Sequence, residues 1–360
     1  MKILIISNDR DGKGGWATYT QSLTNELKQE GHDIHFANNL GAPLPYFTNP
    51  FIALLKVWRL KKTIKTLKPD IIHITVEPYS AMLPLLGKSI AAKTILTIHG
   101  SYGIRMLQGS INQKLAKWIL HNIGKYICVS TYTKTRVTQE IENILGKNAA
   151  KIFKEKSHIV VNGINIAHPI THPKNTTKQI LCVGGVKPRK GVLESLQALS
   201  EYIKNIDRAV HMKIIGVYNP EDPYVQKLQN FIVSQRLSAY VTFTGMVSDD
   251  ELHTLYSETD LYLMPAKTTH DAFEGFGLVY IEAASYGIPC IGTSDSGAAE
   301  AINEGVSGYK CNPEDSPAIS AAIGKVLLDN SINREKCREW AEQHSIQKMT
   351  RNITEIYSNI

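Results

Sequence analysis

Short apolar runs alternate with amphipathic stretches along this chain of 360 residues. In its first half the runs lie at residues 2–6, 32–37, 70–75, 93–98 and 126–130, and a segment at 159–164 closes this half. Continuous apolar runs of this length are typical of parallel strands buried on both faces. Between them apolar residues recur at helical spacing, as Tyr19, Leu23 and Leu27 do before Gly31. The alternation predicts a doubly wound parallel sheet.

A second alternation follows residues 168–178, which have the composition of a linker. We expect strands at 179–183, 212–216, 241–245, 261–265 and 289–292, a helix at 192–204, and a helix capped by Ser248. The predicted fold class is α/β, with two Rossmann-like domains facing a central cleft. Their predicted bounds are 1–167 and 168–340, and a helix at about 341–360 is expected to pack back on the first domain.

Glu274 and Glu282 lie eight positions apart, at the two ends of an apolar stretch with a helical pattern. Eight residues of α-helix turn through roughly 800°, so such residues lie within about 80° of one another. Gly275 and Gly277 would let a ligand approach backbone N–H groups at the helix start, where anions bind. We therefore expect both carboxylates to face one ligand. The alternative is a pair of ordinary, solvent-exposed glutamates.

Composition narrows the classes of function. With 43% hydrophobic residues the chain can bury a full core. It shows neither a signal-peptide pattern nor an apolar run long enough to span a membrane. We therefore expect a cytoplasmic protein. Five cysteines without a CxxC motif are expected to be reduced, buried thiols rather than metal ligands. Residues 1–167 hold 22 Lys and Arg against 10 Asp and Glu, a balance of +12, so this half is expected to meet an anionic partner.

The helix predicted at residues 50–68 carries much of this positive charge. No acid lies between Phe51 and Pro69. One interpretation is the solvated face of a helix that packs on the core. The other is a peripheral contact with anionic lipid headgroups at the inner face of a membrane. The cations that would make this contact are Lys56, Arg59, Lys61, Lys62 and Lys65.

Three loops at predicted strand ends carry candidate chemistry. The loop of residues 12–15 is rich in glycine, and His99 follows the strand at 93–98. The loop of residues 184–191 combines three glycines with the cations Lys187, Arg189 and Lys190. Ligands gather at the carboxyl ends of strands in open α/β sheets, so these loops suit a substrate that contains a phosphate. No Asp-x-Asp cluster is placed to bind a metal, so a metal site and a cofactor are not expected.

Read together, these motifs resemble the family 4 retaining glycosyltransferases of the GT-B fold, over nearly the whole chain. The matching segments are Gly14-Gly15-Trp16, Thr97-Ile-His99-Gly100, Val161-Asn162-Gly163, Val183-Gly184-Gly185-Val186 with Lys190-Gly191, Phe243-Thr-Gly245, the stretch from Glu274 to Ala283, and Gly308-Tyr309. The resemblance implies a nucleotide-sugar donor bound mainly by the C-terminal domain, and transfer of a hexose with retention of configuration.

The resemblance also implies roles for matching residues. Glu282 would accept hydrogen bonds from the ribose, while Glu274 and His99 would face the donor sugar. Lys190 would bind the diphosphate. The remaining donor-binding residues would be Gly14, Gly15, Gly185, Lys187, Arg189, Phe276, Gly277, Leu278 and Val279. The family usually has an arginine where this chain has Gly185, and either Lys187 or Arg189 is expected to replace it.

The segment 267–273 is similar to that of bacterial mannosyltransferases that act on phosphatidylinositol lipids, which favours GDP-mannose over UDP-hexoses. A lipid-linked or envelope-saccharide acceptor is expected against the basic half. The alternatives are a soluble sugar-phosphate or inositol-phosphate acceptor, a nucleotide-sugar epimerase, and a non-catalytic nucleotide-sugar-binding protein. Nucleic acid is not an expected partner, because basic and aromatic residues are not interleaved.

Overall fold

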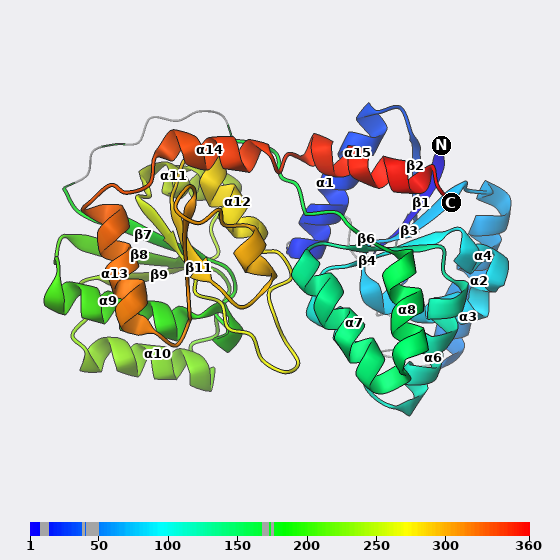
Figure 1. Ribbon diagram of the computed structural model, residues 1–360, viewed down its shortest axis with the longest axis horizontal. Coiled ribbons are helices and arrows are strands. Elements are labelled where there is room, and N and C mark those ends of the chain that lie inside the picture. The colour runs from blue at the N-terminus through cyan, green and yellow to red at the C-terminus, as the bar shows by residue number, and fades with distance from the viewer. Residues whose placement is uncertain (8–13, 38–39, 41–49, 168–172, 174–175) are drawn as a thin grey trace. The chain divides into compact units, whose positions relative to one another are not determined.

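The computed structural model describes residues 1–7, 14–37, 40, 50–167, 173 and 176–360, which form two compact units (Figure 1). Unit 1 comprises Met1–Asn165 and Ile346–Ile360, and unit 2 comprises Ile166–Ser345. Each unit contains a parallel sheet of six strands with flanking helices, which confirms the predicted α/β class.

The sheet of unit 1 has the order β2-β1-β3-β4-β5-β6. The central strands coincide with the predicted apolar runs because their side chains are buried on both faces, whereas the edge strand β2 is largely half-buried and β6 only overlaps the predicted segment 159–164. The strands are β1 (Lys2–Ile6), β2 (Asp33–Ala37), β3 (Ile71–Ile74), β4 (Thr94–Ile98), β5 (Lys125–Cys128) and β6 (Ser157–Ile159). The helical segments are α1 (Gly15–Gln29), α2 (Pro50–Leu67), η1 (Glu77–Met82), α3 (Leu83–Leu86), α4 (Lys88–Ala92), α5 (Ser101–Arg105), α6 (Ser110–Asn122), α7 (Thr131–Leu145) and α8 (Lys147–Lys156).

The last helix of the chain, α15 (Ile346–Tyr357), completes the core of unit 1 beside α1 (Figure 1). Its residues Ile346, Met349 and Ile353 join the cluster that contains Ile3 and Leu23. The helix expected at about 341–360 does pack on unit 1, but it begins at Ile346, because α14 (Arg334–Glu342) precedes it as a separate helix of unit 2. His344 and the residues beside it form the break between the two helices.

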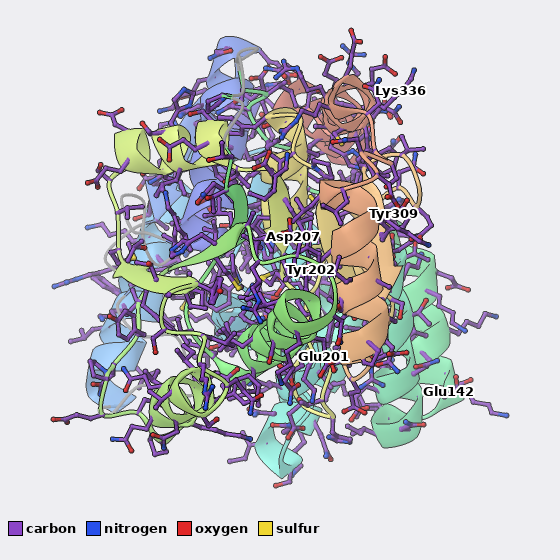
Figure 2. The ribbon with its side chains drawn as sticks, turned by 90° about the vertical axis from the view of Figure 1, so that its left-hand side faces the viewer. Glu142, Glu201, Tyr202, Asp207, Tyr309 and Lys336 are labelled. Atoms are coloured by element: carbon purple, nitrogen blue, oxygen red, sulfur yellow. The ribbon has the colours of Figure 1, made fainter. Side chains whose placement is uncertain are left out.

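Unit 2 has the strand order β12-β11-β10-β7-β8-β9. Its strands are β7 (Lys178–Val183), β8 (Val210–Ile215), β9 (Val241–Gly245), β10 (Leu261–Leu263), β11 (Cys290–Thr293) and β12 (Gly308–Cys311). Its further helical segments are η2 (Pro188–Lys190), α9 (Val192–Asn205), α10 (Pro223–Ser234), α11 (Asp249–Glu258), α12 (Leu278–Ser285), η3 (Gly297–Glu300) and α13 (Ser316–Leu327). On α9 the Tyr202 ring lies in the core beside the more exposed Glu201 (Figure 2).

Two local predictions can be compared directly with the structure. Ser248 caps α11 in a reciprocal capping box with Glu251, as expected. The five cysteines are free thiols, but Cys311 is only half-buried, because it ends the edge strand β12. No helix in the described part of the chain is both long enough and apolar enough to cross a membrane.

Candidate active site

In the sheet of unit 2, the side on which the chain adds strands changes between β7 and β10. From β7 the chain adds β8 and β9 on one side, and it then returns to place β10 on the other side. In parallel sheets such a switch point leaves a crevice at the carboxyl ends of the two strands, where ligands bind. The loops that follow β7 and β10 contain residues 184–191 and 264–277. They therefore bring the predicted cations and Glu274 to the same edge.

Close backbone packing holds the first loop against the second. Gly191 adopts a left-handed conformation with φ +70, and a Cβ atom there would lie 1.9 Å from the carbonyl oxygen of Pro265. Only glycine fits this position. The Lys267 N–H donates to the Arg189 carbonyl at 2.8 Å, which ties the cation-bearing turn to the strand end of β10.

One oxygen of Glu274 contacts two cations. Its Oε2 lies 2.8 Å from Lys190 Nζ and 2.9 Å from Arg189 Nη1. The Lys190 and Glu274 side chains are only 14% and 17% exposed, so water screens this pair weakly. Burial would raise the pKa of Glu274, but the two adjacent cations hold that pKa below its usual value. Glu274 is therefore a carboxylate at neutral pH, and the cluster carries a surplus of one positive charge.

The expectation that Glu274 and Glu282 share one helix is wrong. The helix α12 begins at Leu278, so Glu274 lies in the preceding loop, where its carbonyl accepts the Gly297 N–H at 3.0 Å. The reason is Gly277, which caps the helix in a left-handed conformation with φ +79 and reverses the chain before the first helical turn.

Glu282 lies on α12 and is partly buried. Burial raises the pKa of Glu282, and the positive charge of Lys190 partly opposes this rise. Lys190 therefore acts on both carboxylates, although only Glu274 forms an ion pair with it. The two glutamates have pKa values shifted in opposite directions, which is a common feature of functional sites.

The other predicted donor-binding residues of unit 2 divide into three groups. Leu278 and Val279 form the half-exposed first turn of α12, where backbone N–H groups are free of helical partners. Phe276 is 2% exposed and its ring lies 5.8 Å from that of His344, so its side chain belongs to the core. Lys187 is exposed, and a Cβ atom on Gly185 would lie 3.9 Å from its Cε; the cations that pair with Glu274 are Arg189 and Lys190.

His99 follows β4 in unit 1, and two contacts hold its ring. Its Nε2–H donates to the Thr75 carbonyl at 3.0 Å, and the edge of the Tyr19 ring packs against it with ring centroids 4.6 Å apart. Burial lowers the pKa of His99 to about 4, so the imidazole is neutral at pH 7. Because Nε2 carries the proton, the neutral ring presents Nδ1 as a hydrogen-bond acceptor.

Glu77 was not predicted from the sequence as a site residue. Its side chain is completely buried, and its Oε1 accepts a hydrogen bond from the backbone N–H of His99 at 2.7 Å. Burial raises the pKa of Glu77 to about 7. An acid directly after a buried apolar strand, in Val76-Glu77-Pro78, was the available signal, since β3 lies between β1 and β4.

A chain of buried hydrogen bonds leads from α15 to the neighbourhood of His99. Tyr357 Oη lies 2.6 Å from His73 Nδ1, His73 Nε2 lies 2.7 Å from Thr97 Oγ1, and that oxygen lies 3.2 Å from Tyr19 Oη. Burial lowers the pKa of His73 to about 3, so His73 is a neutral member of this chain. The C-terminal helix thus helps to fix the Tyr19 ring that packs against His99.

The glycine loop of unit 1 is described only in part. Gly14 caps α1 with φ +131, and Gly15 is the first residue of that helix. Residues 12 and 13 of the predicted loop lie outside the described residues. Among the residues that the structure describes, nothing lies within 4 Å of a Cβ atom added to either glycine, so these residues would not block a ligand at the start of α1.

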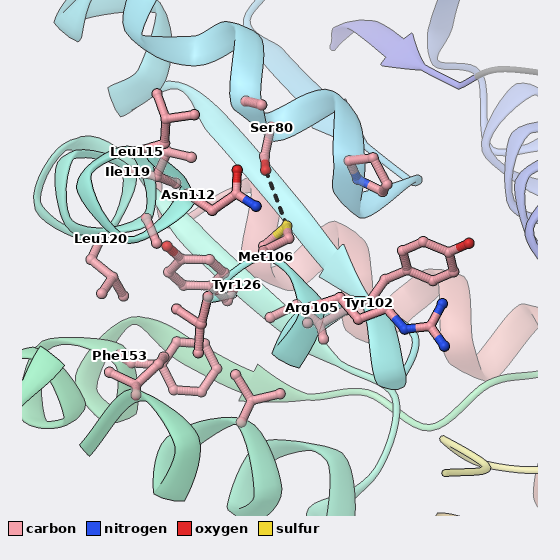
Figure 3. A pocket seen from close by; sticks show the side chains of 18 residues that line it. Ser80, Tyr102, Arg105, Met106, Asn112, Leu115, Ile119, Leu120, Tyr126 and Phe153 are labelled. Atoms are coloured by element: carbon pink, nitrogen blue, oxygen red, sulfur yellow. Dashed lines mark hydrogen bonds between the residues drawn. The ribbon is translucent and has the colours of Figure 1, made fainter. Parts of the chain in front are cut away.

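An apolar pocket of about 80 Å³ lies elsewhere in unit 1, beside α5 and α6 (Figure 3). Met106, Leu115, Ile119, Tyr126 and Phe153 are among its lining residues. The predicted site residues of unit 1 do not line it. In the described part of the chain, His, Cys, Asp and Glu side chains do not gather in groups of three or more that could hold a metal ion.

Comparison with known proteins identifies the family. A model described as "Glycosyl transferases group 1" matches residues 164–344, and one described as "Glycosyltransferase Family 4" matches residues 13–168. The chain is 26% identical to an uncharacterized glycosyltransferase of Methanocaldococcus jannaschii, over 83% of this chain and 78% of that protein. It is 29% identical to a GDP-mannose-dependent alpha-(1-6)-phosphatidylinositol monomannoside mannosyltransferase of Mycolicibacterium smegmatis, over 70% of this chain and 65% of that protein.

Solved structures agree with this assignment at the level of the fold. HepE from Anabaena, in complex with UDP and glucose, matches with a TM-score of 0.77 and 19% identity over 100% of both chains. Two parallel α/β units and two family models that together span nearly the whole chain lead to one conclusion: this chain belongs to the group 1, family 4 glycosyltransferases and has the GT-B fold.

Proposed function

We propose that this glycosyltransferase moves a hexose, with mannose favoured, from a nucleoside diphosphate to a lipid-linked or envelope-saccharide acceptor, with retention of configuration and without a metal ion. The observation that carries the proposal is the contact of Arg189 and Lys190 with Glu274 at the switch point of unit 2. A leaving diphosphate needs positive charge, and two fixed cations in a poorly screened site supply it.

Different residues of the site are proposed to bind different parts of the donor. Lys190 and Arg189 bind the diphosphate oxygens, and the first turn of α12 adds backbone N–H groups. Glu282 accepts hydrogen bonds from the ribose hydroxyls. Glu274, held ionised by its cations, accepts hydrogen bonds from hydroxyls of the donor sugar.

The neutral imidazole of His99 is proposed to contact the donor sugar as a hydrogen-bond acceptor through Nδ1. The donor phosphate itself is proposed to help deprotonate the acceptor hydroxyl on the face from which it leaves. No protein side chain is then required as general base, which fits a site whose ionised carboxylate is already bound to two cations.

The mannosyltransferase of Mycolicibacterium smegmatis supports GDP-mannose as donor, since its name specifies that substrate. The complexes of HepE with UDP, and with UDP and glucose, keep UDP-hexoses as the second candidate. Thermal-shift titration with GDP, UDP, GDP-mannose and UDP-glucose tests the donor directly. A ligand present at 100 times its Kd stabilises the native state by about 2.7 kcal/mol.

Two observations bear on the acceptor. The balance of +12 in residues 1–167 supports an anionic, lipid-linked acceptor. A soluble acceptor is the second candidate, because a relative in Bacillus anthracis, 22% identical over 100% of this chain, is named N-acetyl-alpha-D-glucosaminyl L-malate synthase. Labelled donor can be incubated with phosphatidylinositol lipids or with soluble sugar phosphates. Phase partition of the labelled product then distinguishes a lipid acceptor from a soluble one. A changed donor sugar without any acceptor would instead indicate an epimerase.

A further inference from the structure

The helix α2 presents a continuous surface with apolar side chains in its first half and cations in its second. At about 100° per residue, the side chains near Trp58 lie within about 60° of it around the helix axis. We call this set the outward face of α2: Leu54, Leu55, Trp58, Lys61, Lys62 and Lys65.

The opposite side of α2 fixes the helix to unit 1. Val57, Leu60 and Ile64 are buried, with exposed fractions of 5%, 3% and 7%. They lie roughly 100 to 160° from Trp58 around the axis, and α2 packs against α3. The core contact therefore holds the outward face away from the domain.

The apolar half of the outward face is unusually exposed. The residues Leu54, Leu55 and Trp58 are 55%, 56% and 60% exposed. They are neighbours on one side of α2. Single exposed apolar side chains are common, but three large ones side by side indicate a surface that is covered by a partner. Lys62 Nζ lies 5.8 Å over the Trp58 ring, so the apolar and cationic halves meet directly.

We propose that the outward face of α2 is a membrane-docking surface that inserts Leu54, Leu55 and Trp58 among the acyl chains of an anionic bilayer. Lys61, Lys62, Lys65 and the adjacent Arg59 then contact lipid phosphates. This inference does not rest on the proposed transferase reaction, because it requires neither donor nor acceptor.

The chemistry of the face favours a bilayer over another macromolecule. An interfacial helix lies in the plane of the membrane with Leu and Trp below the headgroups and Lys and Arg at their level. A nucleic acid would match the cations but would leave two leucines and a tryptophan against charged phosphates. A folded protein partner would have to supply several acids beside an apolar pocket, whereas an anionic bilayer offers both everywhere on its surface.

Vesicle co-sedimentation of the full chain tests the proposal. We expect binding to vesicles that contain about a third phosphatidylglycerol and weak binding to phosphatidylcholine alone. Each cation near an anionic surface contributes roughly fivefold in affinity, so replacing the four cations Arg59, Lys61, Lys62 and Lys65 by Gln should weaken binding by roughly 600-fold. The matched control replaces Lys114, Lys117, Lys147 and Lys154 by Gln, which are exposed lysines of α6 and α8 and give the same change in charge.

A second pair of variants tests insertion. Trp58→Ser should lower binding to anionic vesicles at least tenfold. It should also remove the vesicle binding that persists at high salt, because ions do not screen the insertion of an apolar ring. Ile111→Ser on α6 is the control, since Ile111 is 74% exposed in the same unit. Circular dichroism verifies that each variant is folded.

Three results would overturn the proposal. The first is the absence of sedimentation with anionic vesicles at low salt. The second is an equal loss of binding in the α2 and the α6/α8 lysine variants, which would indicate net charge alone. The third is tight binding to an oligonucleotide that competes with vesicles and is lost with the same α2 cations but not with Trp58→Ser.

Discussion

Lys190 Nζ lies 2.8 Å from Glu274 Oε2 although 84 positions separate the two residues in the chain. Arg189 approaches the same oxygen, so one carboxylate is shared by two cations. Without a ligand this leaves a surplus of positive charge at the carboxyl ends of β7 and β10. A diphosphate would compensate the surplus, and Glu274 would keep the Lys190 and Arg189 side chains oriented until it binds.

Lys190→Ala should therefore weaken binding of the nucleoside diphosphate by about 10- to 100-fold, because it removes one charge-assisted contact worth about 1.5–3 kcal/mol. Isothermal calorimetry with GDP and UDP measures the loss. Lys227→Ala is the control, since Lys227 is an exposed lysine of α10 that is not assigned to the donor site. Equal losses in the two variants would contradict the assignment of Lys190.

The two glutamates should respond differently to substitution. Glu282→Ala should abolish donor binding, whereas Glu274→Gln should mainly lower kcat, because only Glu274 is assigned to the transferred sugar. Burial raises the pKa of Glu282, so its carboxylate becomes protonated at a higher pH than an ordinary glutamate does. Donor affinity should therefore fall as the pH decreases toward that pKa. Normal donor affinity in the Glu282→Ala variant would refute the ribose contact.

Much of the fold could be predicted because buried strands and helices leave a local pattern of apolar residues in the sequence. Most strands of the two sheets were found from continuous apolar runs, and the helix cap at Ser248 from the acids that follow it. The edge strand β12 was missed as a strand, because its residues Tyr309, Lys310 and Cys311 are only half-buried and form no apolar run.

The candidate site was predictable in composition but not in geometry. The sequence indicated which cations and carboxylates belong together, but the helix start at Leu278 depends on the left-handed turn at Gly277, which the spacing of the glutamates does not reveal. Glu77 was missed for a related reason. A carboxylate becomes a buried partner of His99 only when β3 and β4 pair, and that contact is tertiary.

Glu77 should make the stability of unit 1 depend on pH. Its pKa rises from an ordinary value of 4.5 to about 7 in the native state, so between these values the native protein binds more protons than the unfolded chain. The contribution of Glu77 to the free energy of unfolding should accordingly fall as pH rises through this window, by about 3 kcal/mol, whereas the lowered pKa values of His73 and His99 act in the opposite direction below pH 6.5. Glu77→Gln keeps an oxygen for the His99 N–H and should remove this dependence.

Urea denaturation at pH 5 and pH 8 measures this effect as a difference between wild type and Glu77→Gln. Glu355→Gln on the exposed side of α15 serves as the control and should follow the wild type. If Glu77→Gln keeps the full pH dependence of the wild type, the buried carboxylate is not its source.

The position of Gly185 offers a test by gain of affinity. The family resemblance implies an arginine there, and a Cβ atom on Gly185 would make only ordinary contacts, with Lys187 Cε and the Val217 carbonyl oxygen at 3.9 Å. Gly185→Arg should tighten nucleoside diphosphate binding by about tenfold, the gain expected from one added charge-assisted contact. Gly184→Arg is the matched control, because Gly184 has φ +145 and a side chain there strains the backbone by about 1–3 kcal/mol. Calorimetry should show tighter binding only for Gly185→Arg, and an unchanged affinity there would mean that Arg189 already supplies the missing contact.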